Sequence, residues 1–209
     1  MAKTAPFDRL SEHYDDWFVE HADAYRAEIK ALKRLLPPFE NGVEIGVGTG
    51  RFAEPLGIKT GVEPSEKMAK IAKKRGIRVI PGVAEKLPLP DSSYDLALMV
   101  TTICFVDDPL QSLREIYRIL RPGGTVMLGF VDAATPLGRN YLAHKAQSRF
   151  YKEARFFTTD EVLELLKKAG FSDCRSVQTL YGDDLKLLDT RIEEGYGEGA
   201  FVALRCRKK

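Results

Sequence analysis

The chain has 209 residues, with 44% hydrophobic side chains, 30% charged side chains and a formal net charge of +2. These values are typical of one globular domain and argue against a disordered chain. The near-neutral charge gives no indication of a nucleic-acid partner, which normally requires a concentrated basic surface.

Targeting and redox features favour a cytoplasmic location. No apolar run approaches the ~18 residues that span a bilayer, and the first 20 residues mix acids, bases and aromatics, unlike a signal peptide. Cys104, Cys174 and Cys206 lie far apart in sequence, without the paired spacing of a metal or redox site. We therefore expect reduced thiols, no bound metal and no membrane association.

The first 36 residues predict a helical cap. Phe7, Tyr14, Trp17 and Phe18 follow the helical period, and a second helical run covers residues 22–36 before Pro37 and Pro38 end it.

From residue 37 onward, short apolar runs alternate with helical patterns, as in βαβ units. Ser65, Asp108 with Pro109, and the Thr158–Glu161 capping box mark the starts of three helices. A further short helix is expected after the first strand, ending at Gly57. The expected strands cover residues 42–46, 60–63, 78–80, 94–100, 125–130, 172–180 and 200–206.

A glycine loop follows the first expected strand. Gly46, Gly48 and Gly50 allow the backbone to turn sharply and to approach a bound molecule where any Cβ would collide. A loop of this kind also occurs for tight packing alone, so it is a weak signal by itself. Glu63, at the end of the second strand, adds a carboxylate that can accept both hydroxyl hydrogens of a ribose.

The spacing and charge of these motifs bear on which nucleoside is bound. The third glycine comes one residue earlier than in the dinucleotide fingerprint. The acids Glu44, Glu63 and Glu85 suit a sulfonium and an amino group better than two phosphates, and Arg51 alone argues otherwise. A nicotinamide-dependent oxidoreductase is therefore disfavoured.

At this point the sequence resembles the class I, Rossmann-like methyltransferases that use S-adenosylmethionine, and most of all the small-molecule branch typified by ubiquinone biosynthesis. The similarity rests on motifs at residues 43–50, 61–68, 82–95, 120–124 and 157–171, in the family's order. It implies a seven-stranded, mostly parallel sheet with helices on both faces, a final antiparallel strand and an N-terminal helical cap.

The resemblance implies roles for individual residues. Gly46, Gly48 and Gly50 would wrap the methionine portion, with Glu44 ordering their loop, and Glu63 would hold the ribose. The adenine would lie near Pro64, Ala84 and Glu85, and the methionine end would face Val100, Thr101 and Thr102. Val83 departs from the family, which often has Asp there. Cys104 and Phe105 stand where relatives often have histidine, so no base is evident on that loop.

The acceptor side offers weaker candidates. Tyr14, Trp17 and Phe18 are interpreted either as a lid or as residues that pack on the sheet, and Phe105 and Thr102 are further candidates. His144 is either a base or substrate contact, or an exposed helical histidine.

The sequence thus predicts one methyltransferase domain over residues 1–209. Its parts are a cap (1–36), a cofactor-binding half (37–130), a substrate-side insertion (131–157) and a C-terminal helix with strands (158–209). We expect S-adenosylmethionine as cofactor and a small-molecule acceptor, methylated on O, N or C, that enters between cap and insertion. A non-catalytic S-adenosylmethionine-binding protein of the same fold is the alternative.

Overall fold

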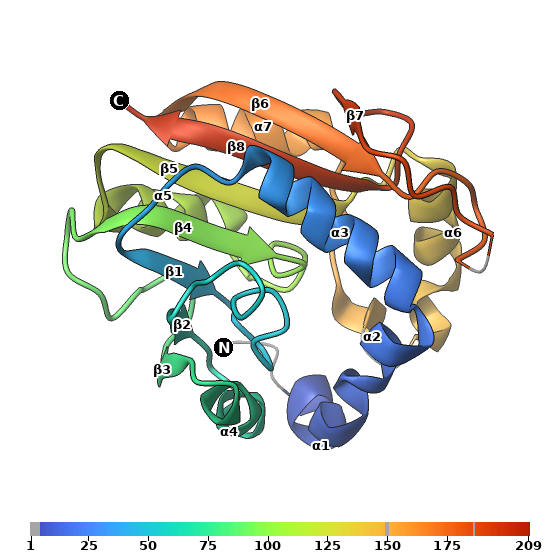
Figure 1. Ribbon diagram of the computed structural model, residues 1–209, viewed down its shortest axis with the longest axis horizontal. Coiled ribbons are helices and arrows are strands. Elements are labelled where there is room, and N and C mark those ends of the chain that lie inside the picture. The colour runs from blue at the N-terminus through green and yellow to red at the C-terminus, as the bar shows by residue number, and fades with distance from the viewer. Residues whose placement is uncertain (1–4, 149–150, 186) are drawn as a thin grey trace.

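The computed structural model describes residues 5–148, 151–185 and 187–209, which form a layered α/β structure (Figure 1). The helices, with two short 3-10 turns labelled η, are α1 (Ala5–Tyr14), α2 (Asp16–Glu20), α3 (Ala22–Leu35), α4 (Glu66–Lys74), α5 (Pro109–Ile119), α6 (Pro136–His144), η1 (Lys145–Gln147), η2 (Tyr151–Glu153) and α7 (Thr159–Lys168). The strands are β1 (Gly42–Ile45), β2 (Thr60–Val62), β3 (Arg78–Ile80), β4 (Tyr94–Val100), β5 (Leu120–Val131), β6 (Phe171–Thr179), β7 (Glu193–Glu194) and β8 (Phe201–Lys208).

The strands form one sheet in the order β3-β2-β1-β4-β5-β8-β6-β7. Strands β1 to β5 are parallel, and β8 runs antiparallel between β5 and β6. The chain crosses from β3 back past β1 to β4, so the order of the strands reverses beside β1. Ligands of open α/β sheets bind beyond the carboxyl ends of the strands at such a reversal.

Each face of the sheet has its own apolar core because successive side chains of a strand point to opposite faces. On β4, Leu96, Leu98 and Val100 pack toward α3, whereas Ala97 and Met99 pack toward α5 and α7. Figure 1 shows α3 lying across one face, with α5 and α7 behind the other. Helix α3 thus forms a layer on the sheet, whereas α1 and α2 lie beyond the strand ends.

The predicted α/β class is confirmed, with one strand more than expected. Among the described residues the sheet has eight strands, because Glu193 and Glu194 pair with Gln178 and Val177 at the outer edge of β6. Strand pairing is made by backbone groups, and the charged segment that contains these two residues has no apolar pattern that predicts a strand. The short helix expected before Gly57 is also wrong, since residues 51–57 form successive turns.

The expectation of three reduced thiols is wrong for two of them. Cys174 and Cys206 form a disulfide between the neighbouring strands β6 and β8, with Cα atoms 4.1 Å apart, and Cys104 is a buried free thiol. The two cysteines are 32 residues apart in sequence, and only strand pairing brings them together. The disulfide removes the thiol argument for a cytoplasmic location. Within the described ranges, no helix combines the length and apolarity needed to cross a membrane.

Candidate active site

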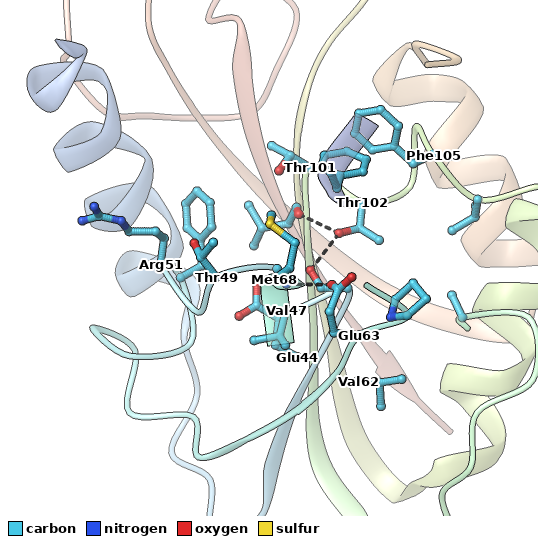
Figure 2. Close-up of a pocket in the computed structure, with 18 of the residues that line it drawn as sticks. Glu44, Val47, Thr49, Arg51, Val62, Glu63, Met68, Thr101, Thr102 and Phe105 are labelled. Atoms are coloured by element: carbon cyan, nitrogen blue, oxygen red, sulfur yellow. Dashed lines mark hydrogen bonds between the residues drawn. The ribbon is translucent and has the colours of Figure 1, made fainter. Parts of the chain in front are cut away.

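A cavity of about 890 Å³, including its open mouth, lies at the carboxyl ends of β1, β2 and β4 (Figure 2). The predicted residues that line it are Tyr14, Phe18, Glu44, Gly46, Gly48, Glu63, Pro64, Ala84, Glu85, Val100, Thr101, Thr102 and Phe105. Segments far apart in the chain therefore meet here, as expected for the end of a parallel sheet. We call this space the cofactor cavity.

The glycine loop forms one wall of the cofactor cavity through backbone alone. Gly46 and Gly48 have φ of 70° and 53°, in the left-handed region that favours glycine. A Cβ on Gly46 would lie 2.4 Å from Cγ2 of Thr102, so no side chain fits there. Gly50 does not line the cavity and instead packs against Ala72 and Ile77. Gly50 therefore serves the packing of the loop against its neighbours and is not part of the cavity wall.

Glu63 lies where β2 ends and faces the glycine loop. Its Oε2 accepts a hydrogen bond from the backbone N–H of Gly48 at 2.9 Å, and its Oε1 accepts one from that of Ser65 at 2.8 Å. Burial raises the pKa of Glu63, although these hydrogen bonds oppose the shift. A carboxylate has about four acceptor positions, so this one retains capacity toward the cavity.

Glu44 lies almost fully buried on β1, beneath the loop. Its carboxylate accepts a hydrogen bond from the backbone of Ala53, while Oε2 has no hydrogen-bond partner among the described residues. Burial raises the pKa of Glu44 well above its ordinary value, and the charge of Glu63 adds to the shift. An orphaned buried acceptor beside a second acid favours a cationic ligand.

The opposite wall of the cofactor cavity is largely apolar. Ala84 is buried, and Val83 adds an apolar side chain to the lining. Glu85 lines the cavity, but its Oε1 accepts hydrogen bonds from the backbone of Asp107 at 2.7 Å and Asp108 at 3.4 Å. Glu85 therefore anchors the loop that leads into α5.

Thr101 connects the end of β4 to the cap. Its φ of 48° is unusual for a β-branched residue, and strain of this kind often marks functional sites. The backbone N–H of Thr101 donates to the Gly129 carbonyl at 2.7 Å, and its side chain is hydrogen-bonded to Tyr14. Tyr14 of α1 thereby lies directly over the carboxyl end of β4.

Two aspartates fasten the cap to the cofactor-binding half. Asp8 accepts a hydrogen bond from the hydroxyl of Ser65 at 2.6 Å. Asp15 accepts one from Thr49 at 2.7 Å and pairs with Arg51 and Arg75. Burial would raise the pKa of Asp15, but these hydrogen bonds outweigh burial and lower it. The sequence patterns did not single out Asp15, because its partners come from the loop and from the end of α4.

A second cavity, of about 760 Å³, adjoins the first. The residues that line both are Phe7, Tyr14, Phe18, Phe52, Thr101 and Phe105. The second cavity lies between the cap and the insertion, and we call it the acceptor cavity because the sequence predicts that the methyl acceptor enters there. Its other lining residues include Trp17 and Glu28 from the N-terminal helices and Leu137, Tyr141 and Tyr151 from the insertion. Figure 1 shows α6 beside the N-terminal part of α3, both of which line this space.

Of the remaining candidates, one lines a cavity and the other does not. Trp17 lines the acceptor cavity only, whereas His144 lines neither cavity and is exposed on α6, with Nδ1 3.0 Å from the Asn140 carbonyl oxygen. Sequence reasoning missed Glu28. A signal existed, because Glu28 falls on the apolar stripe of α3 between Tyr25 and Leu32.

A glycine loop after β1 and a carboxylate at the tip of β2 define a nucleoside-binding α/β protein, and its acidic lining suits a cationic nucleoside. Residues 43–128 match the methyltransferase domain family. A Thermotoga maritima protein, described as an S-adenosylmethionine-dependent methyltransferase and a possible histamine N-methyltransferase, is 55% identical, with a TM-score of 0.94 over 99% of this chain and 100% of its own. This chain belongs to the S-adenosylmethionine-dependent methyltransferases, and S-adenosylmethionine is its cofactor.

Two further relatives extend the comparison. The uncharacterized protein MJ1123 of Methanocaldococcus jannaschii is 45% identical over 97% of this chain and 98% of its own length. A demethylmenaquinone methyltransferase of Chlamydia trachomatis is 35% identical over 55% of each chain. The similarity to MJ1123 therefore covers the cap and the insertion as well as the cofactor-binding half.

Proposed function

We propose that this enzyme methylates a small molecule held in the acceptor cavity. The observation that carries the proposal is the common wall of the two cavities, which includes Tyr14, Thr101 and Phe105. The acceptor cavity, at about 760 Å³, has the size of a small-molecule site and is lined mainly by apolar and aromatic side chains. A macromolecular acceptor would instead require an open surface at this position.

The cofactor cavity supports a specific placement of S-adenosylmethionine. Gly46 and Gly48 leave room for the methionine part, the orphaned Oε2 of Glu44 suits its amino group, and Glu63 is placed for the ribose hydroxyls. The adenine would be enclosed by Pro64, Ala84 and Glu85. Val100, Thr101 and Thr102 would then lie near the methyl group, at the wall toward the acceptor.

The bound cofactor supplies a methyl group already activated on a sulfonium. The protein's task is therefore to align the acceptor and to exclude water. Tyr14, Phe18 and Phe105 present aromatic side chains where the cavities meet, and aromatic faces attract a cation. The hydrogen bond between Tyr14 and Thr101 would hold the cap closed over this junction.

Filling the acceptor cavity tests the proposal. Leu137 lines the cavity, so Leu137→Trp should abolish methyl transfer while the affinity for S-adenosylhomocysteine stays within about threefold. Leu142→Trp, at a 41% exposed position of the same helix, is the control and should retain transfer. Transfer is measured from radiolabelled S-adenosylmethionine to the low-molecular-mass fraction of a cell extract. Label found in RNA or protein instead, or transfer unaffected by Leu137→Trp, would contradict the proposal.

The relatives are described with acceptors of two different chemistries. The Thermotoga maritima protein is described as a possible histamine N-methyltransferase, and the Chlamydia trachomatis protein is a demethylmenaquinone methyltransferase. An amine and a quinol make opposite demands on a cavity, so the acceptor class has to be inferred from the lining.

A further inference from the structure

Glu28 is a carboxyl group inside the acceptor cavity. It lies on the sheet-facing side of α3 and is 4% exposed. Among the described residues, none provides it with a hydrogen bond or an ion pair, and burial is what raises its pKa. An ionisable group in such a place costs stability unless a partner arrives. No contact with the described residues therefore explains why this position carries an acid.

The surroundings of Glu28 define the partner it lacks. The described residues that line the acceptor cavity include no lysine, arginine or histidine. Most of the lining is aromatic: Tyr151 contacts Phe105 and Tyr141, with ring centroids 5.9 and 5.6 Å apart, and Trp17 is contributed by α2. A single acid within an aromatic enclosure complements a cationic nitrogen, which gains both an ion pair and contacts with ring faces.

From this juxtaposition we infer that the acceptor is a primary or secondary amine on an apolar or aromatic body, with its nitrogen held by Glu28. The inference rests on the proposed function, since it places the acceptor in the same cavity. A neutral acceptor such as a quinol would leave the carboxylate without a counter-charge. An acidic acceptor would be repelled.

Glu28 also has a use during the reaction. An alkyl amine arrives as an ammonium ion, which has no free electron pair, so one proton must leave nitrogen before attack. Binding of the ammonium displaces the proton of Glu28 to solvent, so the carboxylate can accept the proton of the nitrogen. The nitrogen then forms a bond to the methyl carbon as the carbon–sulfur bond breaks. The product is a methylated ammonium and a neutral thioether, and Glu28 is left protonated, as it was before the acceptor bound.

The surroundings tune Glu28 for this exchange. Burial raises its pKa to about 8, nearer to the ~10 of an alkyl ammonium than an ordinary carboxyl would be. The titratable groups that face it are Tyr25 on its own helix, Tyr141 on α6 and Tyr151 on η2. Burial raises the pKa of all three, so they remain neutral while Glu28 titrates.

The test compares matched ligands on protein saturated with S-adenosylhomocysteine. The probes are arylalkylamines with one or two rings, beginning with 2-phenylethylamine, and the corresponding alcohols. Trp17, the single tryptophan of the chain, lines the cavity and reports binding by its fluorescence. We expect the amines to bind at least about tenfold more tightly than their alcohols. Glu28→Gln should abolish that preference, and Asp23→Asn, at an exposed position of the same helix, should retain it.

The outcomes separate this inference from the function on which it rests. Alcohols that bind as tightly as amines, or a preference that survives Glu28→Gln, would overturn the amine while leaving a small-molecule acceptor in place. Absence of binding by every probe, with methyl label found in RNA or protein, would overturn the proposed function itself. The comparison of amine with alcohol on the unaltered protein holds even if the Glu28 variant folds poorly.

Discussion

Oε2 of Glu63 accepts a hydrogen bond from the backbone N–H of Gly48 at 2.9 Å, so the acid at the tip of β2 fixes the shape of the glycine loop that follows β1. We propose that the same carboxylate also receives the ribose hydroxyls. One side chain would therefore serve both the loop and the ligand, and its removal should affect cofactor binding twice.

Replacement of Glu63 by Ala should weaken binding of S-adenosylmethionine and S-adenosylhomocysteine by at least about tenfold, since hydrogen bonds to charged groups contribute about 1.5–3 kcal/mol each. Isothermal calorimetry measures the effect. Glu66→Ala, three residues further on and exposed in the first turn of α4, should bind normally. Normal affinity in the Glu63 variant would mean that this acid does not contact the cofactor.

Removal of the Asp15 charge should loosen the cap. In Asp15→Asn the ion pairs with Arg51 and Arg75 are lost because Asn carries no charge. The backbone amides of residues 5–20 should therefore exchange faster, as measured by hydrogen-exchange mass spectrometry. Asp16→Asn, at an exposed neighbouring position, is the control. Cofactor binding should protect the same segment in the unaltered protein. Equal protection with and without cofactor would show that the cap is a fixed layer.

The pH dependence of the cap follows from the same residue. The pKa of Asp15 is lowered in the folded protein, so its stabilising contribution is present above the unfolded value of ~3.9 and disappears as the pH falls through the lower folded value. Protection factors of residues 5–20, taken relative to the intrinsic exchange rate at each pH, should therefore fall in acid. In the Asn variant this fall should be smaller.

Glu28→Gln should stabilise the protein at alkaline pH. The pKa of Glu28 is about 8 when folded, against 4.5 as its ordinary value, so the folded state holds a proton that the unfolded state has lost between these values. Stability therefore falls as the pH rises through this window, by up to roughly 5 kcal/mol at 1.36 kcal/mol per unit. In thermal unfolding, Glu28→Gln should raise the melting temperature most at pH 8 and least near pH 5. Asp23→Asn should show no such dependence on pH. Equal gain at both pH values would contradict the buried, unpaired acid.

No histidine should be indispensable for methyl transfer. None of His13, His21 and His144 lines the cofactor or acceptor cavity as described. Each replacement by Ala should therefore lower kcat/KM by less than about tenfold, whereas loss of a general base typically costs ~10²–10⁴-fold. A thousandfold loss in His144→Ala with cofactor binding intact would show that the insertion carries a base after all.

Local sequence was sufficient for most of the elements and for the predicted residues that meet in the cofactor cavity. Ser65, Asp108 and Thr158 cap helices as expected, because a capping hydroxyl or carboxylate acts within a few residues of its own position. The glycine loop and Glu63 meet because parallel strands bring their carboxyl ends to one edge of the sheet. Periodicity and strand order therefore predict this half of the enzyme.

The tertiary structure decided those features that form only when elements from distant parts of the chain come into contact. The disulfide between Cys174 and Cys206 exists because β6 and β8 are neighbours, and Asp15 finds Thr49 and Arg75 because the cap folds over the loop. Glu28 becomes a buried, unpaired acid because Tyr141 and Tyr151 of the insertion enclose it opposite α3. Burial and the absence of a counter-charge are properties of that enclosure, so a glutamate on a helix could reveal its chemistry only once the cavity had formed around it.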